Sequence, residues 1–281
     1  MKFKVSSELT YQFNSPGTLI LNIHALKTSY QQILEEFFIV EPYFYYEELI
    51  SVSADNRFVR VNITKPSPVK LRYSATVDNS YILLDPGVLY EVQVRDMDAL
   101  VLSYLNPSRY CQSDKLYRLA NNMFGHIENA FEKVLALTEW IYNNVEYLSG
   151  STNSQTSAYD TVTEQAGVCR DFAHLGIALC RALTIPARYF TGYSYKLSPP
   201  DFHACFEAYL GGRWIIFDPT KLAPLNGLVK IATGRDAADT AIASIFGDVR
   251  FDAISVNCEL AEDSFVPHDY SQIRASALSY L

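Results

Sequence analysis

The 281-residue sequence has few basic residues, no closely spaced cysteines and no long apolar run. Lysine and arginine total 23 against 31 aspartates and glutamates, which gives a formal net charge of −8. No basic run exceeds two residues, and this charge pattern argues against nucleic acid as a partner. No apolar stretch approaches the ~20 residues of a membrane span, so we expect no membrane segment.

The five cysteines are odd in number and widely spaced, and none belongs to a Cys-x-x-Cys pair. Structural zinc sites use such close ligand pairs, so we predict neither a metal nor a cofactor. An odd set of thiols without a disulfide framework fits a reducing compartment. The first residues have no long apolar core typical of a signal peptide, and together these features predict a cytoplasmic protein.

The length of the chain is enough for two domains. Residues 1–105 contain several short alternating segments separated by turn clusters, which predicts an N-terminal β-sandwich-like domain. Asn106-Pro107 is the expected boundary, and residues 106–281 form the second domain. In that domain we predict a helix from Glu132 to Tyr147, and a loosely held polar tail over residues 262–281.

Apolar residues recur at spacings of three and four from about Val168 to Leu183, which predicts an amphipathic helix that ends before Pro186. Cys169 falls in its first turn. Unpaired backbone N–H groups and the positive end of the helix dipole favour an anion there. A thiolate is an anion, so this position favours the reactive form of the cysteine, and the same N–H groups can stabilise an oxyanion.

A second pattern predicts a hairpin that carries a histidine and an aspartate. Alternation places His203 and Cys205 on one face of a strand, and Gly211-Gly212 is typical of a two-residue turn. With that turn, Cys205 lies opposite Asp218, and His203 is the diagonal neighbour of Asp218 on the same face. A three-residue turn would put the two on opposite faces.

A cysteine, a histidine and an aspartate in this order meet the needs of a thiol nucleophile: a base takes its proton and a carboxylate orients the base. Each residue alone has a simpler interpretation. A lone helical cysteine is usually a small buried hydrophobic residue, a strand histidine is usually structural, and Asp-Pro-Thr is often only a turn. The hypothesis of a catalytic Cys169, His203 and Asp218 therefore depends on their conjunction.

The motifs around these residues resemble those of a known family. They are Gly167-Val-Cys-Arg-Asp-Phe-Ala173, Ile185-Pro-Ala-Arg-Tyr-Phe-Thr-Gly192, the strand that carries His203, and Trp214 through Asp218-Pro-Thr220. Together they resemble the prokaryotic branch of the transglutaminase-like superfamily, whose members are usually described as cysteine proteases. The resemblance covers about residues 100–250. It implies a papain-like core with a triad at Cys169, His203 and Asp218. One departure is Cys205, which stands where the family often has a large aromatic residue, and it bears on substrate contacts.

The expected fold is therefore α+β: a papain/transglutaminase-like core, with a helix-borne cysteine packed on an antiparallel sheet, behind the N-terminal domain. The expected function is thiol-dependent acyl transfer at an amide, with hydrolysis of a peptide or amide bond through a thioester acyl-enzyme. Three alternatives stay open: transfer of the acyl group to an amine, arylamine N-acetyltransfer, and a non-catalytic binding module. The expected partner is a peptide or amide substrate. The sequence does not decide the oligomeric state, or whether Gln165 is an oxyanion donor or a surface residue.

Overall fold

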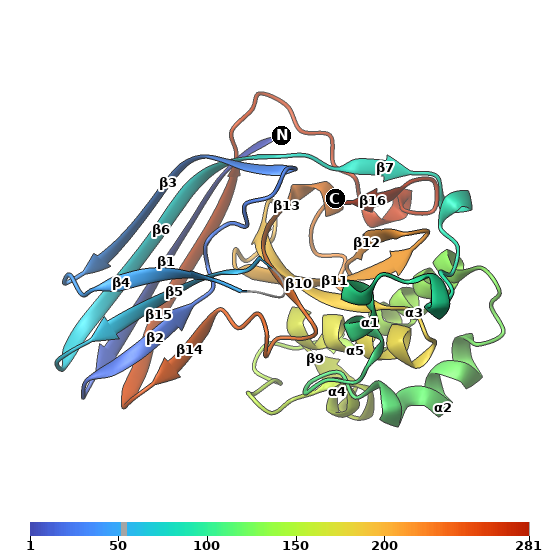
Figure 1. Ribbon diagram of the computed structural model, residues 1–281, viewed down its shortest axis with the longest axis horizontal. Helices are drawn as coiled ribbons and strands as arrows, with labels where there is room; N and C mark the ends of the chain where they lie inside the picture. The colour runs from blue at the N-terminus through green and yellow to red at the C-terminus, as the bar shows by residue number, and fades with distance from the viewer. Residues whose placement is uncertain (52–54, 281) are drawn as a thin grey trace.

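A computed structural model describes residues 1–51 and 55–280, and Figure 1 shows two bodies side by side. The first is a sandwich of long strands in two antiparallel sheets, with strand orders β15-β1-β6-β3 and β14-β2-β5-β4. Its strands are β1 (Lys2–Phe13), β2 (Gly17–Leu21), β3 (Gln31–Glu41), β4 (Tyr46–Ile50), β5 (Arg57–Ile63), β6 (Ser67–Asn79), β14 (Ala243–Phe246) and β15 (Val249–Leu260).

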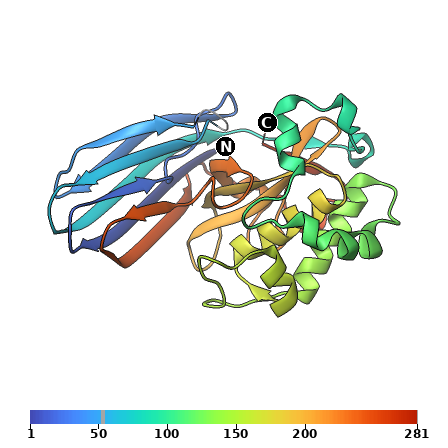
Figure 2. The ribbon, with the colours of Figure 1, turned by 60° about the horizontal axis from the view of Figure 1, so that its bottom comes forward.

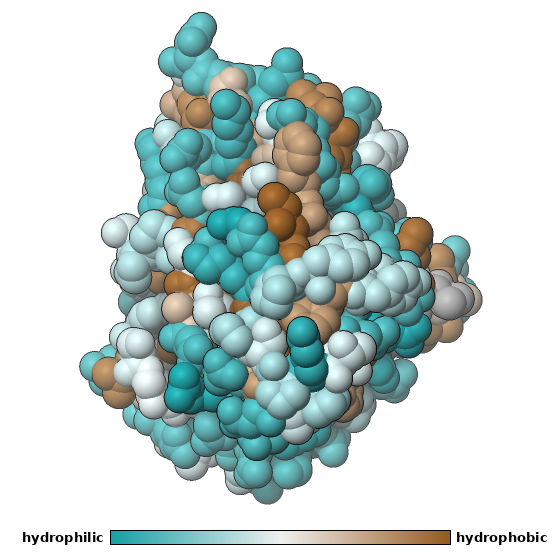
Figure 3. Space-filling model, turned by 90° about the vertical axis from the view of Figure 1, so that its left-hand side faces the viewer, coloured by the Kyte–Doolittle hydropathy of each residue, from teal (hydrophilic) through white to brown (hydrophobic). Residues whose placement is uncertain are grey.

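Alternation along the strands builds the core of this sandwich. Every second side chain of β1, from Phe3 to Phe13, is buried between the two sheets, while the residues between them face outward. The outer surface is mostly hydrophilic and is interrupted by separate apolar patches, as Figure 3 shows for one side of the molecule. The predicted N-terminal β-sandwich-like domain is confirmed.

Two strands from the far end of the chain complete the sandwich. β15 pairs with β1 and β14 pairs with β2, so red strands lie among blue ones in Figure 1. Without them, β1 and β2 would each expose a row of unpaired backbone groups. The expected division at residue 105 therefore does not separate the sheets, because residues 243–260 return to the first body. The sequence does not indicate this return, since strand pairing across such a distance leaves no local signal.

The second body places helices against a four-stranded antiparallel sheet of order β12-β11-β10-β13, and Figure 2 shows the green-to-yellow helices α2 to α5 gathered on one side of it. Helix α5 packs directly on β10 and β11, and all its residues from Asp171 to Ala182 are buried. This is the predicted α+β class. The elements of this body are α1 (Ala99–Leu102), α2 (Ser113–Phe124), α3 (Ala130–Asn144), β8 (Glu146–Tyr147), α4 (Ala158–Glu164), β9 (Ala166–Gly167), α5 (Cys169–Ala182), β10 (Ala187–Ser194), β11 (Phe202–Leu210), β12 (Arg213–Phe217) and β13 (Leu228–Gly234).

Two local predictions were wrong. Helix α3 ends at Asn144, and Glu146–Tyr147 is instead the short strand β8, parallel to β9. The polar tail is not loosely held either. Strand β16 (Ala277–Ser279) pairs with β7 (Ile82–Leu84), and the Tyr280 hydroxyl accepts the Leu228 N–H and donates to the Leu225 carbonyl. In both cases distant partners outweigh local composition. Among residues 1–51 and 55–280, no helix is both long and apolar enough to cross a membrane.

Candidate active site

Cys169 is the first residue of α5 and is partly exposed. The turn before it is fixed by Asp171, whose buried Oδ2 accepts the Val168 N–H at 2.9 Å. Gly167 is required by this arrangement, because a Cβ there would lie 2.7 Å from the Cβ of Asp171. The local sequence therefore holds the thiol at the electropositive end of the helix, where an anion is stabilised.

The hairpin has the predicted register. Gly211 and Gly212 have φ angles of +56° and +79° and form the turn, Leu210 pairs with Arg213, and Phe206 pairs with Phe217. Positive φ at both turn positions is the conformation that glycine adopts without steric cost. The predicted common face of His203 and Asp218 is confirmed by a contact of 2.8 Å between Nε2 and Oδ2.

Asp218 is itself held in place by the turn that follows it. Its Oδ1 accepts the backbone N–H of Thr220 at 2.9 Å and the Thr220 hydroxyl at 2.7 Å. The other oxygen is thereby directed at the imidazole, and both side chains are buried. The Asp-Pro-Thr motif forms a turn, in agreement with its simpler interpretation. The same turn also directs the Asp218 carboxylate toward His203. The sequence did not single out Thr220.

The imidazole of His203 joins this carboxylate to the cysteine. Its Nε2 contacts Asp218, and its ring lies near the Cys169 thiol, whose proximity contributes to the pKa of the imidazole. Burial is the largest single influence and lowers the pKa of His203, but the charge of Asp218, its hydrogen bond and the neighbouring Cys205 and Cys169 together raise it more. The net result is a pKa well above the usual value, so the imidazole is held in its protonated form at neutral pH.

Cys205 lies beside the same pair. Donor atoms of His203, Cys205 and Asp218 are within 4.8 Å of one another, which is close enough to share a metal ion. Burial raises the pKa of Cys205 to about 12, so this thiol is neutral, and a cation would also have to displace the proton of His203. The donor set thus favours a proton over a metal at neutral pH, and the expected absence of a metal stays a prediction.

Tyr147 is a site residue that the sequence analysis missed. The pairing of β8 with β9 sets Tyr147 opposite Gly167, and its hydroxyl lies near the backbone N–H and the thiol of Cys169. Burial and the neighbouring Cys169 raise the pKa of Tyr147 to about 12, so the hydroxyl keeps its proton. Gln165 is exposed and ends α4 with a φ of +54°. In the described part of the chain, no hydrogen bond joins its side chain to Cys169.

Cys169 is expected to be the first of the five thiols to react with an alkylating agent. It alone combines partial exposure with a helix start and a neighbouring imidazolium. Burial raises the pKa of Cys205 and Cys258 to about 12 and raises that of Cys111 and Cys180 further. Peptide mapping after limiting iodoacetamide at neutral pH measures the order. Labelling of Cys258 while Cys169 stays unmodified would refute the assignment of the nucleophile.

Comparison with known proteins identifies the family of this chain. Residues 1–100 match the family described as the bacterial transglutaminase N-terminal domain, and residues 117–219 match the transglutaminase-like superfamily. A solved structure from Cytophaga hutchinsonii, described as a "putative cysteine protease", is 59% identical with a TM-score of 0.97, over 100% of this chain and 98% of that one. This chain belongs to the transglutaminase-like superfamily. Its family and this neighbour support a thiol-dependent enzyme.

Curated relatives match a shorter part of the chain. An uncharacterized protein of Mycobacterium leprae is 32% identical over 117 residues, which cover 38% of this chain and 42% of the relative. An uncharacterized protein of Mycobacterium tuberculosis is 34% identical over 119 residues, which cover 37% and 38%. The matched region spans less than half the length of these relatives.

Proposed function

We propose that this member of the superfamily hydrolyses a peptide or amide bond through a thioester acyl-enzyme, with Cys169 as nucleophile, His203 as acid and base, and Asp218 as the group that orients the imidazole. One observation carries the proposal. The thiol at the start of α5 lies near a buried imidazole that Asp218 holds at 2.8 Å. Nucleophile, base and orienting group are thus brought together before any substrate binds.

In the first half of the reaction, the Cys169 sulfur attacks the carbonyl carbon, and the pair of electrons of the C=O bond moves to oxygen. The Cys169 N–H donates to that oxyanion. The intermediate collapses to a thioester as the C–N bond breaks, and His203 gives its proton to the leaving amine. In the second half, neutral His203 takes a proton from water, the hydroxide attacks the thioester, and the carboxylic acid leaves while the thiolate–imidazolium pair is restored.

Tyr147 is placed to supply a second donor to the oxyanion. Its protonated hydroxyl lies at the Cys169 N–H, where the carbonyl oxygen of a bound substrate would arrive. Tyr147→Phe is expected to lower the rate of acylation about 10–100-fold, since one oxyanion donor is worth about 10²–10³ where it is fully engaged and this side chain is 46% exposed. Single-turnover acylation measures the loss, with the exposed Tyr142→Phe as a matched control. An unchanged rate would show that Tyr147 only packs against Phe172.

Asp218→Asn is expected to move the alkaline limb of kcat/KM to lower pH. The Asp218 charge raises the pKa of His203, so its removal makes the imidazolium lose its proton earlier as pH rises. The rate at neutral pH should fall about 10–10³-fold, less than the ~10⁴ of a serine-protease triad, because His203 already holds its proton and the tautomer of its neutral ring matters less. Rate profiles from pH 5 to 10 measure both effects. The control is Asp114→Asn, an exposed carboxylate in the first turn of α2, which should leave the alkaline limb in place; an equal shift in both variants would show a general effect of charge.

Hydrolysis and transfer share every step up to the acyl-enzyme, and the acceptor separates them. The test is a library of acyl-peptide amides, with mass spectrometry of the intact protein to detect the thioester and of the products to identify the acceptor. Free acid as the product in the presence of millimolar primary amine supports hydrolysis. An amide of the added amine as the main product would instead establish transfer, and a protein that never acquires an acyl group would be a binding module.

A further inference from the structure

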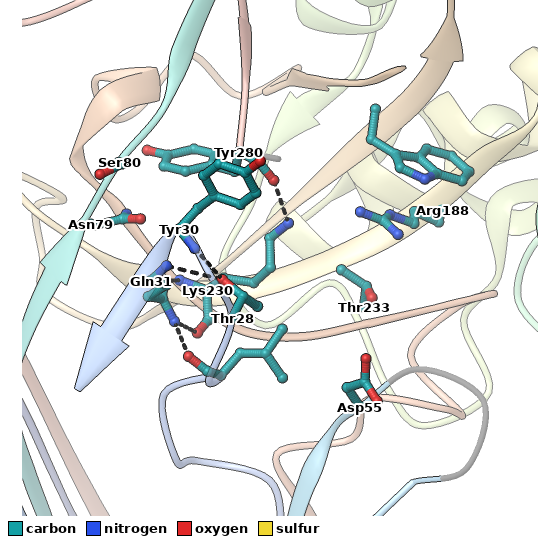
Figure 4. Close-up of a pocket in the computed structure, with 12 residues that line it drawn as sticks. Thr28, Tyr30, Gln31, Asp55, Asn79, Ser80, Arg188, Lys230, Thr233 and Tyr280 are labelled. Atoms are coloured by element: carbon teal, nitrogen blue, oxygen red, sulfur yellow. Dashed lines mark hydrogen bonds between the residues drawn. The ribbon is translucent and has the colours of Figure 1, made fainter. Parts of the chain in front are cut away.

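A second pocket of about 250 Å³ lies where the two bodies meet, and Figure 4 shows its lining. The pocket is lined by residues of the sandwich and its connections, by strands β10, β12 and β13 of the core, and by the C-terminal segment. These residues are Leu26, Thr28, Tyr30, Gln31, Asp55, Asn79, Ser80, Arg188, Trp214, Lys230, Thr233 and Tyr280. None of these is Cys169, His203 or Asp218. Tyr30, Asp55 and Ser80 are exposed at its mouth, while Lys230 and Thr233 are buried at its base.

The base of the pocket carries an excess of positive charge. Arg188 donates from Nε to one oxygen of Glu207, and the Lys230 Nζ donates to the other oxygen at 2.9 Å. Glu207 is fully buried. Among the residues that the structure describes, these two cations share a single carboxylate at the base of the pocket, so one positive charge there has no countercharge. Water solvates such a charge poorly in a recessed site, so an anion bound there is stabilised.

Arg188 has free donors to meet that anion. Only its Nε is used by Glu207; in the described part of the chain, its two terminal amino groups have no hydrogen-bond acceptor. The guanidinium lies 4.2 Å from the centre of the Trp214 ring, which fixes its plane, and its side chain is 17% exposed. A stacked guanidinium with both terminal groups free matches the two oxygens of a carboxylate.

The rest of the pocket suits an apolar body. Tyr30, Trp214 and Tyr280 supply aromatic surface, and the volume of about 250 Å³ exceeds the ~150 Å³ that suffices to hold benzene in a protein interior. We propose that this pocket binds a small monocarboxylate with an aromatic or similarly sized apolar body, whose carboxylate meets the terminal amino groups of Arg188. Both a free organic acid and the end of a peptide offer this chemistry.

Asp55 lines the mouth of the pocket, and its carboxylate has no partner among the residues that the structure describes. A carboxylate at the entrance repels an entering anion. Asp55→Asn should therefore tighten the binding of an acid and leave the binding of a neutral analogue unchanged. Tighter binding of the acid by Asp55→Asn would be specific to a charged ligand, because the affinity of a purely apolar pocket would not respond to the loss of the Asp55 charge.

Trp214 reports on the site in solution. The chain has two tryptophans, so Trp140→Phe leaves Trp214 as the only one. In that background we expect a titration with benzoate to change the Trp214 fluorescence until the site is saturated. Benzoate should bind at least about 10-fold more tightly than benzamide, its neutral analogue of the same shape. N-acetylphenylalanine against its amide tests the peptide-end source in the same way, and the tighter of the two acids identifies the source.

Arg188→Lys is the decisive variant, because it keeps a cation beside Glu207 while it removes the planar fork. It should weaken benzoate at least about 10-fold, with Arg250→Lys on the exposed face of the sandwich as the matched control. A thermal melt shows that each variant is folded. Equal binding of benzoate and benzamide, no response to 20 mM of either acid, or unchanged affinity in Arg188→Lys would each overturn the proposal. Acyl transfer enters none of these measurements, so the outcome is independent of the proposed function.

Discussion

Cys169→Ala is expected to abolish acyl-enzyme formation. No other side chain in the described site can carry the acyl group: Cys205 is fully buried, and burial raises its pKa to about 12. We expect turnover to fall by at least about 10⁴-fold, to the level that substrate binding and the oxyanion donors alone support. His203→Ala should be nearly as damaging, since the thiolate then loses its imidazolium and the leaving amine loses its proton donor.

Fold stability is the control for this result. Cys169 is only partly buried, so its truncation removes little packing, and the midpoint of thermal unfolding should shift by no more than a few degrees. Intact-protein mass spectrometry after a single turnover measures the thioester, and a melt of the same sample measures the fold. A Cys169→Ala protein that is folded and still turns over substrate would exclude Cys169 as the nucleophile. Cys205→Ala, tested in parallel, should retain the acyl-enzyme.

Glu207→Gln is expected to cost about 3–5 kcal/mol of the free energy of unfolding. The fully buried carboxylate is the shared partner of Arg188 and Lys230, and an amide leaves the buried Lys230 and the partly buried Arg188 without this countercharge. Burial raises the pKa of Glu207, but the two cations lower it more, so the folded value lies below the unfolded one. Its contribution to stability is therefore present above the unfolded pKa and is lost as pH falls through the folded pKa.

Urea unfolding of wild type and Glu207→Gln at pH 7 and at pH 4 measures both parts of this prediction. The difference between the two proteins should be largest at pH 7 and smaller in acid. Glu47→Gln provides the control, because Glu47 pairs with Arg60 on the surface, where an ion pair contributes at most about 1 kcal/mol. If Glu207→Gln costs no more than Glu47→Gln, the ion pairs of Glu207 with Arg188 and Lys230 do not stabilise the fold.

The sequence predicted those features of the site that depend on residues close together in the chain. The apolar spacing of Val168–Leu183 gave the helix within one residue at each end, and therefore the place of Cys169. Strand parity across Gly211-Gly212 gave the contact of His203 with Asp218, because the two positive φ angles fix the register of a two-residue turn. Both inferences use periodicities of the backbone, which do not depend on the rest of the fold.

Contacts between segments far apart in the chain were decided only by the tertiary structure. Tyr147 reaches Cys169 through the parallel pair β8–β9, and β15 joins a sheet that begins more than 200 residues earlier. Arg188, Glu207 and Lys230 meet only because β10, β11 and β13 lie side by side, and Tyr280 joins them because the tail packs back on the core. The physical reason is the same in each case. Local sequence determines helix, strand and turn, whereas the burial of apolar faces and the pairing of strands determine which distant segments meet.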